Sequence, residues 1–176
     1  NGKEYVGGLV GELIRGRIED CSAEDTVIAA WSRAGGLVGY TYQDNDSWIR
    51  RCNVNAVVSG KYCIGGLVGL NGVPIIDCHV KFKIERTQSA LSNYGGFIGE
   101  NYSDISRSTA EGIITTKGSQ NVDVGGFVGY NSGLIWDCNS NVNINAIQGK
   151  SVGGFVGVNN NIILKCYSLG SVTGNI

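Results

Sequence analysis

Apolar and polar residues alternate along several short stretches of the chain. From residue 138 to 145, small or apolar residues expected to face inward alternate with asparagines. Residues 78–84 alternate in the same way between apolar and basic residues. Period-two alternation with many β-branched residues is typical of a half-buried β-strand. No segment shows an apolar stripe with a period of 3.6 residues, so the pattern predicts an all-β protein with essentially no helix.

The alternating stretches belong to a repeat. The sequence Gly-Gly-Leu/Phe-Val/Ile-Gly begins at Gly7, Gly35, Gly65, Gly95, Gly125 and Gly153, in steps of 28, 30, 30, 30 and 28 residues. A fixed period of this size indicates a repeat architecture. We therefore predict one repeat domain over residues 1–176, with units that start near residues 5, 33, 63, 93, 123 and 151.

Alignment of the units gives further columns. An isoleucine column comprises Ile18, Ile49, Ile75, Ile105, Ile135 and Ile163, and three residues later come Cys21, Cys52, Cys78, Ser108, Cys138 and Cys166. Each unit is expected to hold roughly three strands, and one unit alone cannot bury its apolar side. Stacking in register solves this, so we predict a parallel β-solenoid (β-helix) of six coils with about 28–31 residues per coil.

The alternation fails at two places in each unit. In Gly65-Gly66-Leu67-Val68-Gly69 both central residues are apolar. Either this strand is covered on both faces, or the glycines form a bulge that turns the chain. The parity also changes between the isoleucine and the cysteine columns, where we expect a corner.

Two polar columns bear on the register. The residue before the cysteine position alternates in sign: Asp20, Arg51, Asp77, Arg107, Asp137 and Lys165. Parallel stacking would place opposite charges on neighbouring coils, although each exposed pair contributes only about 0–1 kcal/mol. A second column, Asn71, Asn101, Asn131 and Asn159, predicts an asparagine ladder at a turn, with amides that bond along the axis.

These columns resemble the GLUG repeat. The third unit carries the motif as Ile64-Gly65-Gly66-Leu67-Val68-Gly69-Leu70-Asn71, followed by Ile75-Ile76-Asp77-Cys78 and Ile84. The fourth unit departs at Ser108, and the first two units have Leu13 and Thr41 at the asparagine position. The resemblance implies an extracellular β-solenoid of bacterial secreted and surface proteins, adhesins and regions beside immunoglobulin A peptidase domains. It implies no catalytic residue within the repeat.

Five of the cysteines, Cys21, Cys52, Cys78, Cys138 and Cys166, share one inward-facing column. Buried cysteine packs as a small apolar residue, so we expect an inert stack of reduced thiols. Cys63 lies two residues before Gly65, in a column that otherwise looks solvent-facing. It is the candidate for a reactive or intermolecular thiol, with an incidental surface residue as the alternative.

Candidate chemistry is sparse. A net charge of −1, from 14 basic and 15 acidic residues, gives no case for nucleic acid or an anionic membrane. No apolar run is long enough to span a bilayer, and we predict no cofactor. Asp44-Asn45-Asp46 could contact calcium but lacks the spacing and the later glutamate of a calcium loop, so we predict a polar loop tip and no metal site. Glu19, Glu24 and Asp44 are candidate acids for polysaccharide cleavage, and the single histidine, His79, reads as a surface residue.

The aromatic residues Tyr40, Tyr42, Trp48, Tyr102 and Tyr130 fall in expected loops or near them. They could stack on sugar rings, contact a protein or cover the core. We predict a non-enzymatic structural or adhesive segment, located outside the cell or on its surface. Its partners would be flanking repeats, other copies of itself, or a host protein or glycan. Alternatives are a filament subunit joined through coil ends and a polysaccharide-active β-helix enzyme.

Overall fold

The computed structural model describes residues 2–29, 31–85, 92–116, 122–147 and 149–175, whose regular structure is entirely β-strand. The strands form four parallel sheets, and each repeat unit contributes to every sheet in turn. The predicted all-β parallel β-solenoid is therefore confirmed. Within the described residues, no helix has the length and apolar character needed to cross a membrane.

The first two sheets lie on either side of the Gly-Gly bend. The glycine sheet consists of β1 (Tyr5–Gly7), β5 (Arg33–Gly35), β9 (Ile64–Gly65), β13 (Ser92–Gly95), β17 (Val122–Gly125) and β21 (Ser151–Gly153). The asparagine sheet consists of β2 (Val10–Leu13), β6 (Val38–Thr41), β10 (Val68–Asn71), β14 (Ile98–Asn101), β18 (Val128–Asn131) and β22 (Val156–Asn159).

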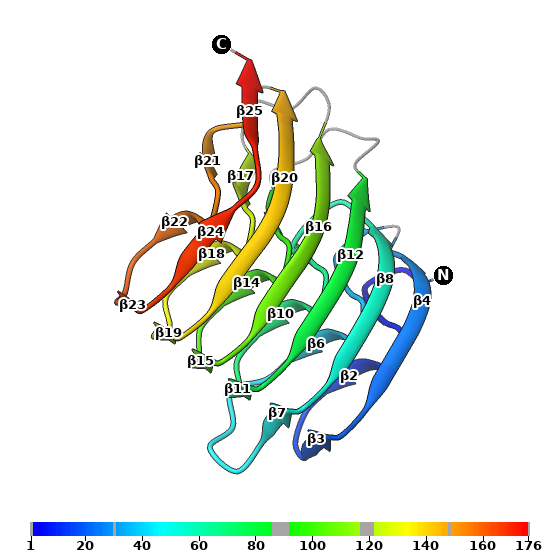
Figure 1. Cartoon of the computed structure of the whole chain (residues 1–176). Helices are drawn as coiled ribbons and strands as arrows, with labels where there is room; N and C mark the ends of the chain where they lie inside the picture. The colour runs from blue at the N-terminus through cyan, green and yellow to red at the C-terminus, as the bar shows by residue number, and fades with distance from the viewer. Residues whose placement is uncertain (1, 30, 86–91, 117–121, 148, 176) are drawn as a thin grey trace.

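The other two sheets complete each coil. The isoleucine sheet consists of β3 (Arg17–Glu19), β7 (Trp48–Arg50), β11 (Ile75–Ile76), β15 (Ile105–Ser106), β19 (Ile135–Trp136) and β23 (Ile163–Leu164). The long sheet consists of β4 (Ser22–Ile28), β8 (Asn53–Ser59), β12 (His79–Glu85), β16 (Thr109–Thr116), β20 (Asn139–Ile147) and β24 (Tyr167–Leu169), and β25 (Val172–Asn175) also pairs with β20. Its strands run side by side from blue to red in Figure 1.

The prediction of roughly three strands per unit is wrong, because the Gly-Gly segment ends one strand and a second begins after it. A Cβ atom on Gly65 would lie 2.0 Å from the Val68 carbonyl oxygen and 2.8 Å from that of Phe97 on the next coil. Only a residue without a side chain permits this approach, so the chain bends here. The chain turns at this segment, as one alternative predicted, but without a bulge, because Gly65 pairs with Gly95 and Val68 with Ile98 without an extra residue. Leu67 and Val68 are both fully buried, as the other alternative predicted.

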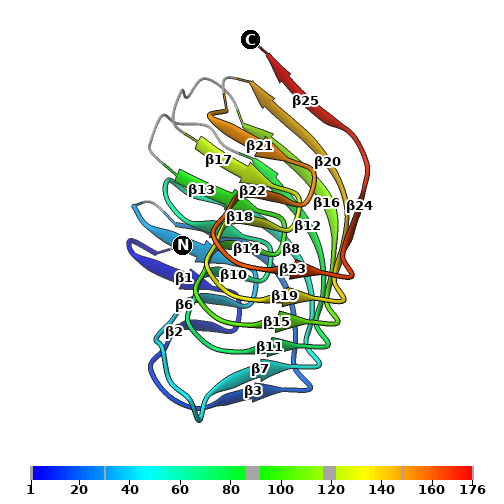
Figure 2. The ribbon, with the colours of Figure 1, turned by 90° about the vertical axis from the view of Figure 1, so that its left-hand side faces the viewer.

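The repeat columns stack directly. Ile75 pairs in register with Ile49 on one side and with Ile105 on the other. Figure 2 shows the isoleucine strands from β3 to β23 lying one above another like rungs. Between the sheets, apolar columns form one continuous buried core. The rings of Phe97 and Phe127 stack with centroids 4.6 Å apart, and Phe127 and Phe155 stack at 4.9 Å.

Candidate functional site

The asparagine column forms a hydrogen-bonded ladder inside the asparagine sheet. Each Nδ2 donates to the Oδ1 of the next coil: 2.9 Å from Asn71 to Asn101, 2.8 Å from Asn101 to Asn131, and 2.8 Å from Asn131 to Asn159. Each of the first three amides also donates to the carbonyl oxygen two residues later. Thr41, which replaces asparagine in the second unit, donates from Oγ1 to Asn71 at 3.1 Å. The buried amides are thus satisfied along the axis.

The charged column occupies the corner between the isoleucine and long sheets. All six residues have positive φ, from 47° at Arg107 to 55° at Asp77. This left-handed conformation costs a non-glycine residue roughly 1–2 kcal/mol, and it explains why the alternation changes parity here. Sequence patterns located the corner, but no glycine or asparagine marked its backbone conformation.

Two arginines of this column bind the aspartate on the preceding coil through two nitrogens. Arg51 donates to Asp20 at 2.6 Å from both Nε and Nη2, and Arg107 donates to Asp77 at 2.7 and 3.0 Å. These hydrogen bonds lower the pKa of Asp20 and of Asp77 below the ordinary carboxyl value. These two pairs therefore link neighbouring coils at the surface.

The cysteine column turns inward directly after this corner. The thiols of Cys52, Cys78 and Cys138 donate to carbonyl oxygens two residues earlier, at 3.3, 3.3 and 3.2 Å. Ser108 makes the same bond at 2.8 Å and accepts one from the Cys78 amide at 3.1 Å. All six cysteines are free thiols, and burial raises the pKa of Cys138 to about 12. The column thus serves as a set of small hydrogen-bonding groups.

Cys63 departs from the prediction. Its side chain is only 7% exposed, so its column does not face solvent at this position. Burial and the nearby Glu100 carboxylate raise the pKa of the Cys63 thiol. Because the thiolate is the reactive form, both effects disfavour a reactive or intermolecular role. The alternation was misread because the glycine and asparagine sheets lie close together, with a Cβ on Gly69 only 2.9 Å from the Cys63 carbonyl oxygen.

Tyrosines gather on the outer side of the asparagine sheet. The Tyr40 ring stacks on Tyr5 at 5.1 Å, meets Tyr42 edge-on at 4.6 Å and lies 4.8 Å from the Arg33 guanidinium. Tyr102 and Tyr130 form a second group, with ring centroids 6.0 Å apart. Tyr42 and Tyr102 remain 42% and 43% exposed. These two rings are the accessible members of the aromatic set.

A cavity of about 370 Å³ lies between the two tyrosine groups. We call it the tyrosine slot; its lining includes Tyr40, Tyr42, Gln43, Leu70, Gly72 and Tyr102. A neighbouring hollow of about 690 Å³ shares Gln43, Gly72 and Tyr102 with the slot and adds the polar residues Asp44, Asn45, Asp46, Ser103 and Asp104. We call this second space the polar hollow. An aromatic site therefore adjoins a group of oxygen acceptors.

The slot was not predicted, although the sequence contained its signal. The outward position of the asparagine sheet is Tyr40 in the second unit and Leu70 in the third, and the position after the asparagine column is Tyr42, Gly72 and then Tyr102. The third unit thus lacks both rings. The absence of both rings from the third unit indicates a binding slot only once the coils are known to stack with these positions on one face.

Trp48 lies on β7, in the isoleucine sheet, and its groups are already engaged. The Arg17 guanidinium covers the ring at 3.7 Å, and the indole Nε1 donates to Glu19 at 2.5 Å. Glu19 also pairs with Arg50 at 3.4 Å. Trp48 therefore stabilises the first two coils and does not line the slot.

The three candidate acids lie on different elements. Glu19 belongs to β3 and Glu24 to β4, whereas Asp44 belongs to the loop after β6 and accepts a hydrogen bond from Ser47. Asp44 also lies 4.0 Å from Arg15. In the part of the chain that the structure describes, no three histidine, cysteine or acidic side chains cluster as metal ligands would. The structure does not bring the candidate acids into one pair across a groove.

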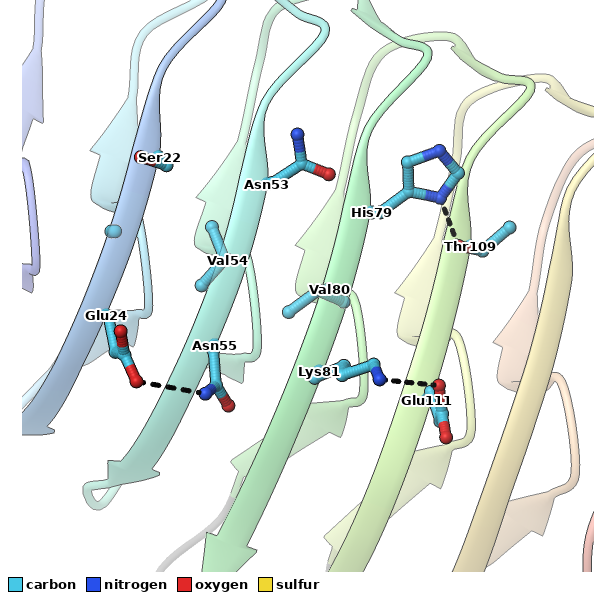
Figure 3. A pocket seen from close by; sticks show the side chains of 11 residues that line it. Ser22, Glu24, Asn53, Val54, Asn55, His79, Val80, Lys81, Thr109 and Glu111 are labelled. Atoms are coloured by element: carbon cyan, nitrogen blue, oxygen red, sulfur yellow. Dashed lines mark hydrogen bonds and ion pairs between the residues drawn. The ribbon is translucent and has the colours of Figure 1, made fainter.

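His79 lies on the exposed face of the long sheet, beside a hollow of about 500 Å³. Its Nδ1 is 2.5 Å from the Thr109 hydroxyl, Lys81 pairs with Glu111 at 3.8 Å, and Asn55 donates to Glu24 at 3.4 Å (Figure 3). His79, Lys81 and Asn55 thus each contact a residue on a neighbouring strand, which favours a structural use of these three side chains.

Comparison with known protein families supports the resemblance to the GLUG repeat in the first unit. The model of the GLUG motif matches residues 2–28. The matched span is the first repeat unit, from just before β1 to the end of β4. The other five units place their residues at the same structural positions, and the GLUG motif together with the β-solenoid fits a repeat-type structural protein. Comparison with curated proteins and with solved structures gave no match.

Proposed function

We propose that this chain is a non-enzymatic structural segment of an extracellular or surface protein, and that one outer face of the segment is adhesive. The observation that carries the proposal is the division of the asparagine sheet between two sides. From Asn71 to Asn159 the inward side repeats the same ladder, and on the outer side two exposed tyrosines, which directly follow β6 and β14, lie beside carboxylates. The ladder holds the shape and leaves the other side free to vary.

The non-enzymatic part of the proposal rests on how the candidate catalytic groups are used. Glu19 is engaged by Trp48 and Arg50, and His79 by Thr109. Cleavage of a glycosidic bond needs two carboxyl groups on either side of the scissile bond. The placement of Glu19, Glu24 and Asp44 on separate elements favours a structural role over polysaccharide cleavage.

The extracellular location rests on the match to the GLUG motif at residues 2–28 and on the wider resemblance of the other units. Burial raises the pKa of Cys138 and of Cys63, which lowers the fraction of reactive thiolate at these two residues. The hydrogen bond with Cys78 instead lowers the pKa of Cys52 to about 7. Resistance to oxidation is therefore expected of Cys138 and Cys63, and the thiols give no further support to the location.

Attachment of coated beads tests the proposal. Beads that carry the folded chain are applied to an epithelial cell layer and washed, with beads that carry an unrelated β-solenoid as the control. We expect the chain to retain more beads than the control, and to release no reducing sugar from polysaccharides incubated with it. Equal retention would contradict the adhesive role, and release of reducing sugar would contradict the non-enzymatic one.

End-to-end assembly is a second candidate, favoured by the sheet edges. Among the described strands, those of the first and last coils pair with a neighbour on one side only. Unpaired edges can accept further strands, whether from flanking repeats or from another copy. Negative-stain imaging over a range of concentrations separates the two cases. Filaments would support self-assembly, whereas single short rods at every concentration would contradict it.

A further inference from the structure

The tyrosine slot is built into the backbone of the third unit. Tyr42 and Tyr102 occupy equivalent positions two coils apart, and Gly72 lies between them. A Cβ atom on Gly72 would lie 2.7 Å from the Gln43 amide nitrogen and 2.9 Å from the Tyr42 carbonyl carbon. A side chain at this position would collide with the preceding coil. The space between the two tyrosines is therefore kept open by the main chain.

The width of the slot suits one puckered ring. Neighbouring strands of a sheet are about 4.8 Å apart, so the backbones of β6 and β14, which Tyr42 and Tyr102 directly follow, are separated by roughly 10 Å. Carbon atoms in contact are about 3.5–4.0 Å apart, so a ligand that touches both walls consists of a single ring layer. That layer must be somewhat thicker than a flat aromatic ring. Leu70 provides an apolar floor between Tyr40 and Glu100, its register partners. A pyranose ring has this thickness and two faces rich in C–H groups.

The surroundings suit the edges of a sugar. The polar hollow adjoins the slot and provides the carboxylates of Asp44, Asp46 and Asp104. Carboxylates accept hydrogen bonds from hydroxyl groups, which a sugar carries around its rim. Burial raises the pKa of Tyr102 to about 12, and the Glu12 carboxylate raises the pKa of Tyr42, so both tyrosines remain neutral donors at physiological pH.

The same charges select among ligands. A uronate or sialylated glycan would bring its own carboxylates against three aspartates, which is unfavourable. A proline-rich peptide also docks on aromatic grooves, but its polar groups are mostly carbonyl acceptors and need donors. The rim of this slot is dominated by acceptors. An uncharged glycan satisfies both the aromatic walls and the acidic rim.

We propose that the tyrosine slot binds one pyranose ring of an uncharged glycan, stacked between Tyr42 and Tyr102, with its hydroxyl groups directed to the polar hollow. This inference deepens the proposed function, since it names the ligand of the adhesive face. It can also fail separately, because the coated beads could attach through another surface.

Calorimetric titration of the folded chain tests the assignment with cellohexaose, chitohexaose, maltohexaose and hexagalacturonate. We expect at least one uncharged hexamer to bind, and hexagalacturonate to bind at least tenfold more weakly. Loss of one stacking partner costs about tenfold in affinity, so Tyr42→Ala and Tyr102→Ala should each weaken binding by that factor. Tyr62→Ala is the matched control, because Tyr62 is 44% exposed and lies outside the slot. It should change the affinity less than twofold.

A variant that fills the tyrosine slot provides a second test. Leu70→Tyr introduces the residue that Tyr40 already provides at the equivalent position of the preceding unit, so the strand should accept it. The added ring occupies the floor, and binding of the hexamer should be lost while the unfolding temperature stays unchanged. The proposal is overturned if no uncharged hexamer binds, or if binding survives in both tyrosine variants and in Leu70→Tyr. Binding of a decaproline peptide in place of the hexamers would also overturn it.

Discussion

The two sides of the asparagine sheet differ in how strictly they repeat. On the inner side, one asparagine follows another through Asn71, Asn101 and Asn131, and each amide bonds to the next. On the outer side, the equivalent residue is Tyr40, Leu70 or Glu100 in successive coils. The strands are the same, so the difference arises from the neighbours of each side chain.

The difference follows from what each side must satisfy. A buried amide has partners only on adjacent coils, and leaving it unpaired costs about 1–3 kcal/mol. An outward side chain has water as an alternative partner and is free to change. In a β-solenoid, a residue type that repeats from coil to coil therefore indicates a position needed for stability. A position on an outer face where the repeat is interrupted is one where a binding site can arise.

The largest effect is expected at the glycine bend, which joins the glycine sheet to the asparagine sheet and repeats as strictly as the ladder. A Cβ atom on Gly95 would lie 1.9 Å from the Ile98 carbonyl oxygen and 2.8 Å from the Gly129 amide nitrogen. Gly95→Ala should destabilise the fold by at least about 3 kcal/mol, the upper range for overpacking. The measurement is the free energy of unfolding in urea. Gly174→Ala is the control, because its Cβ would be 3.7 Å from the nearest atom.

Removal of one amide from the ladder should have the next largest effect. Asn131→Ala removes one of the two acceptors of the Asn101 amide, which keeps its bond to the Ser103 carbonyl oxygen, and it leaves the Gly133 amide and carbonyl groups without their Asn131 partner. We expect a loss of about 2–3 kcal/mol in the free energy of unfolding, as for other buried unpaired groups. Asn145→Ala removes an exposed asparagine from the long sheet and should change stability by less than about 0.5 kcal/mol. Equal effects of the two substitutions would contradict the ladder's role.

The cysteine column should tolerate exchange of the thiol for a hydroxyl. Ser108 makes the same bond to the carbonyl oxygen two residues earlier that Cys78 makes. Cys78→Ser should therefore cost no more than about 1 kcal/mol, whereas Cys78→Ala leaves the Cys52 amide without its acceptor and should cost about 1–3 kcal/mol. Thermal unfolding of both variants separates these cases. A larger loss from serine than from alanine would show that the column is purely apolar.

The smallest effect is expected at the exposed ion pairs on the outer corner. Arg107 lowers the pKa of Asp77 in the folded state, so the pair stabilises the fold fully above the ordinary carboxyl pKa of about 4. This contribution is lost as the pH falls through the lower, folded-state pKa of Asp77. Asp77→Asn should cost only about 0–1 kcal/mol at neutral pH and flatten the loss of stability in acid. Unfolding titrations from pH 7 to pH 2 would test this; an unchanged acid profile would contradict it.

The sequence predicted those features that repeat along the chain. The glycine segments and the alternating charges recur in all six units and the asparagines in the last four, each at its own fixed position, so parallel stacking follows from their spacing. The environment of Cys63 was mispredicted because strand alternation does not report the close packing of two sheets. The tyrosine slot exists because Leu70 and Gly72 carry no aromatic ring where the neighbouring coils have Tyr40, Tyr42 and Tyr102. That comparison requires the register of the coils.

The central claim is that each coil divides two tasks between the inner and outer sides of the asparagine sheet. Asn101 ends β14 and is fully buried in the ladder, whereas Tyr102, the next residue, is exposed in the slot. The direct test is the free energy of unfolding of Asn101→Ala and Tyr102→Ala, measured side by side in urea. We predict a loss of about 2–3 kcal/mol for the asparagine variant and less than about 1 kcal/mol for the tyrosine variant. Equal losses, or the reverse order, would contradict the claim.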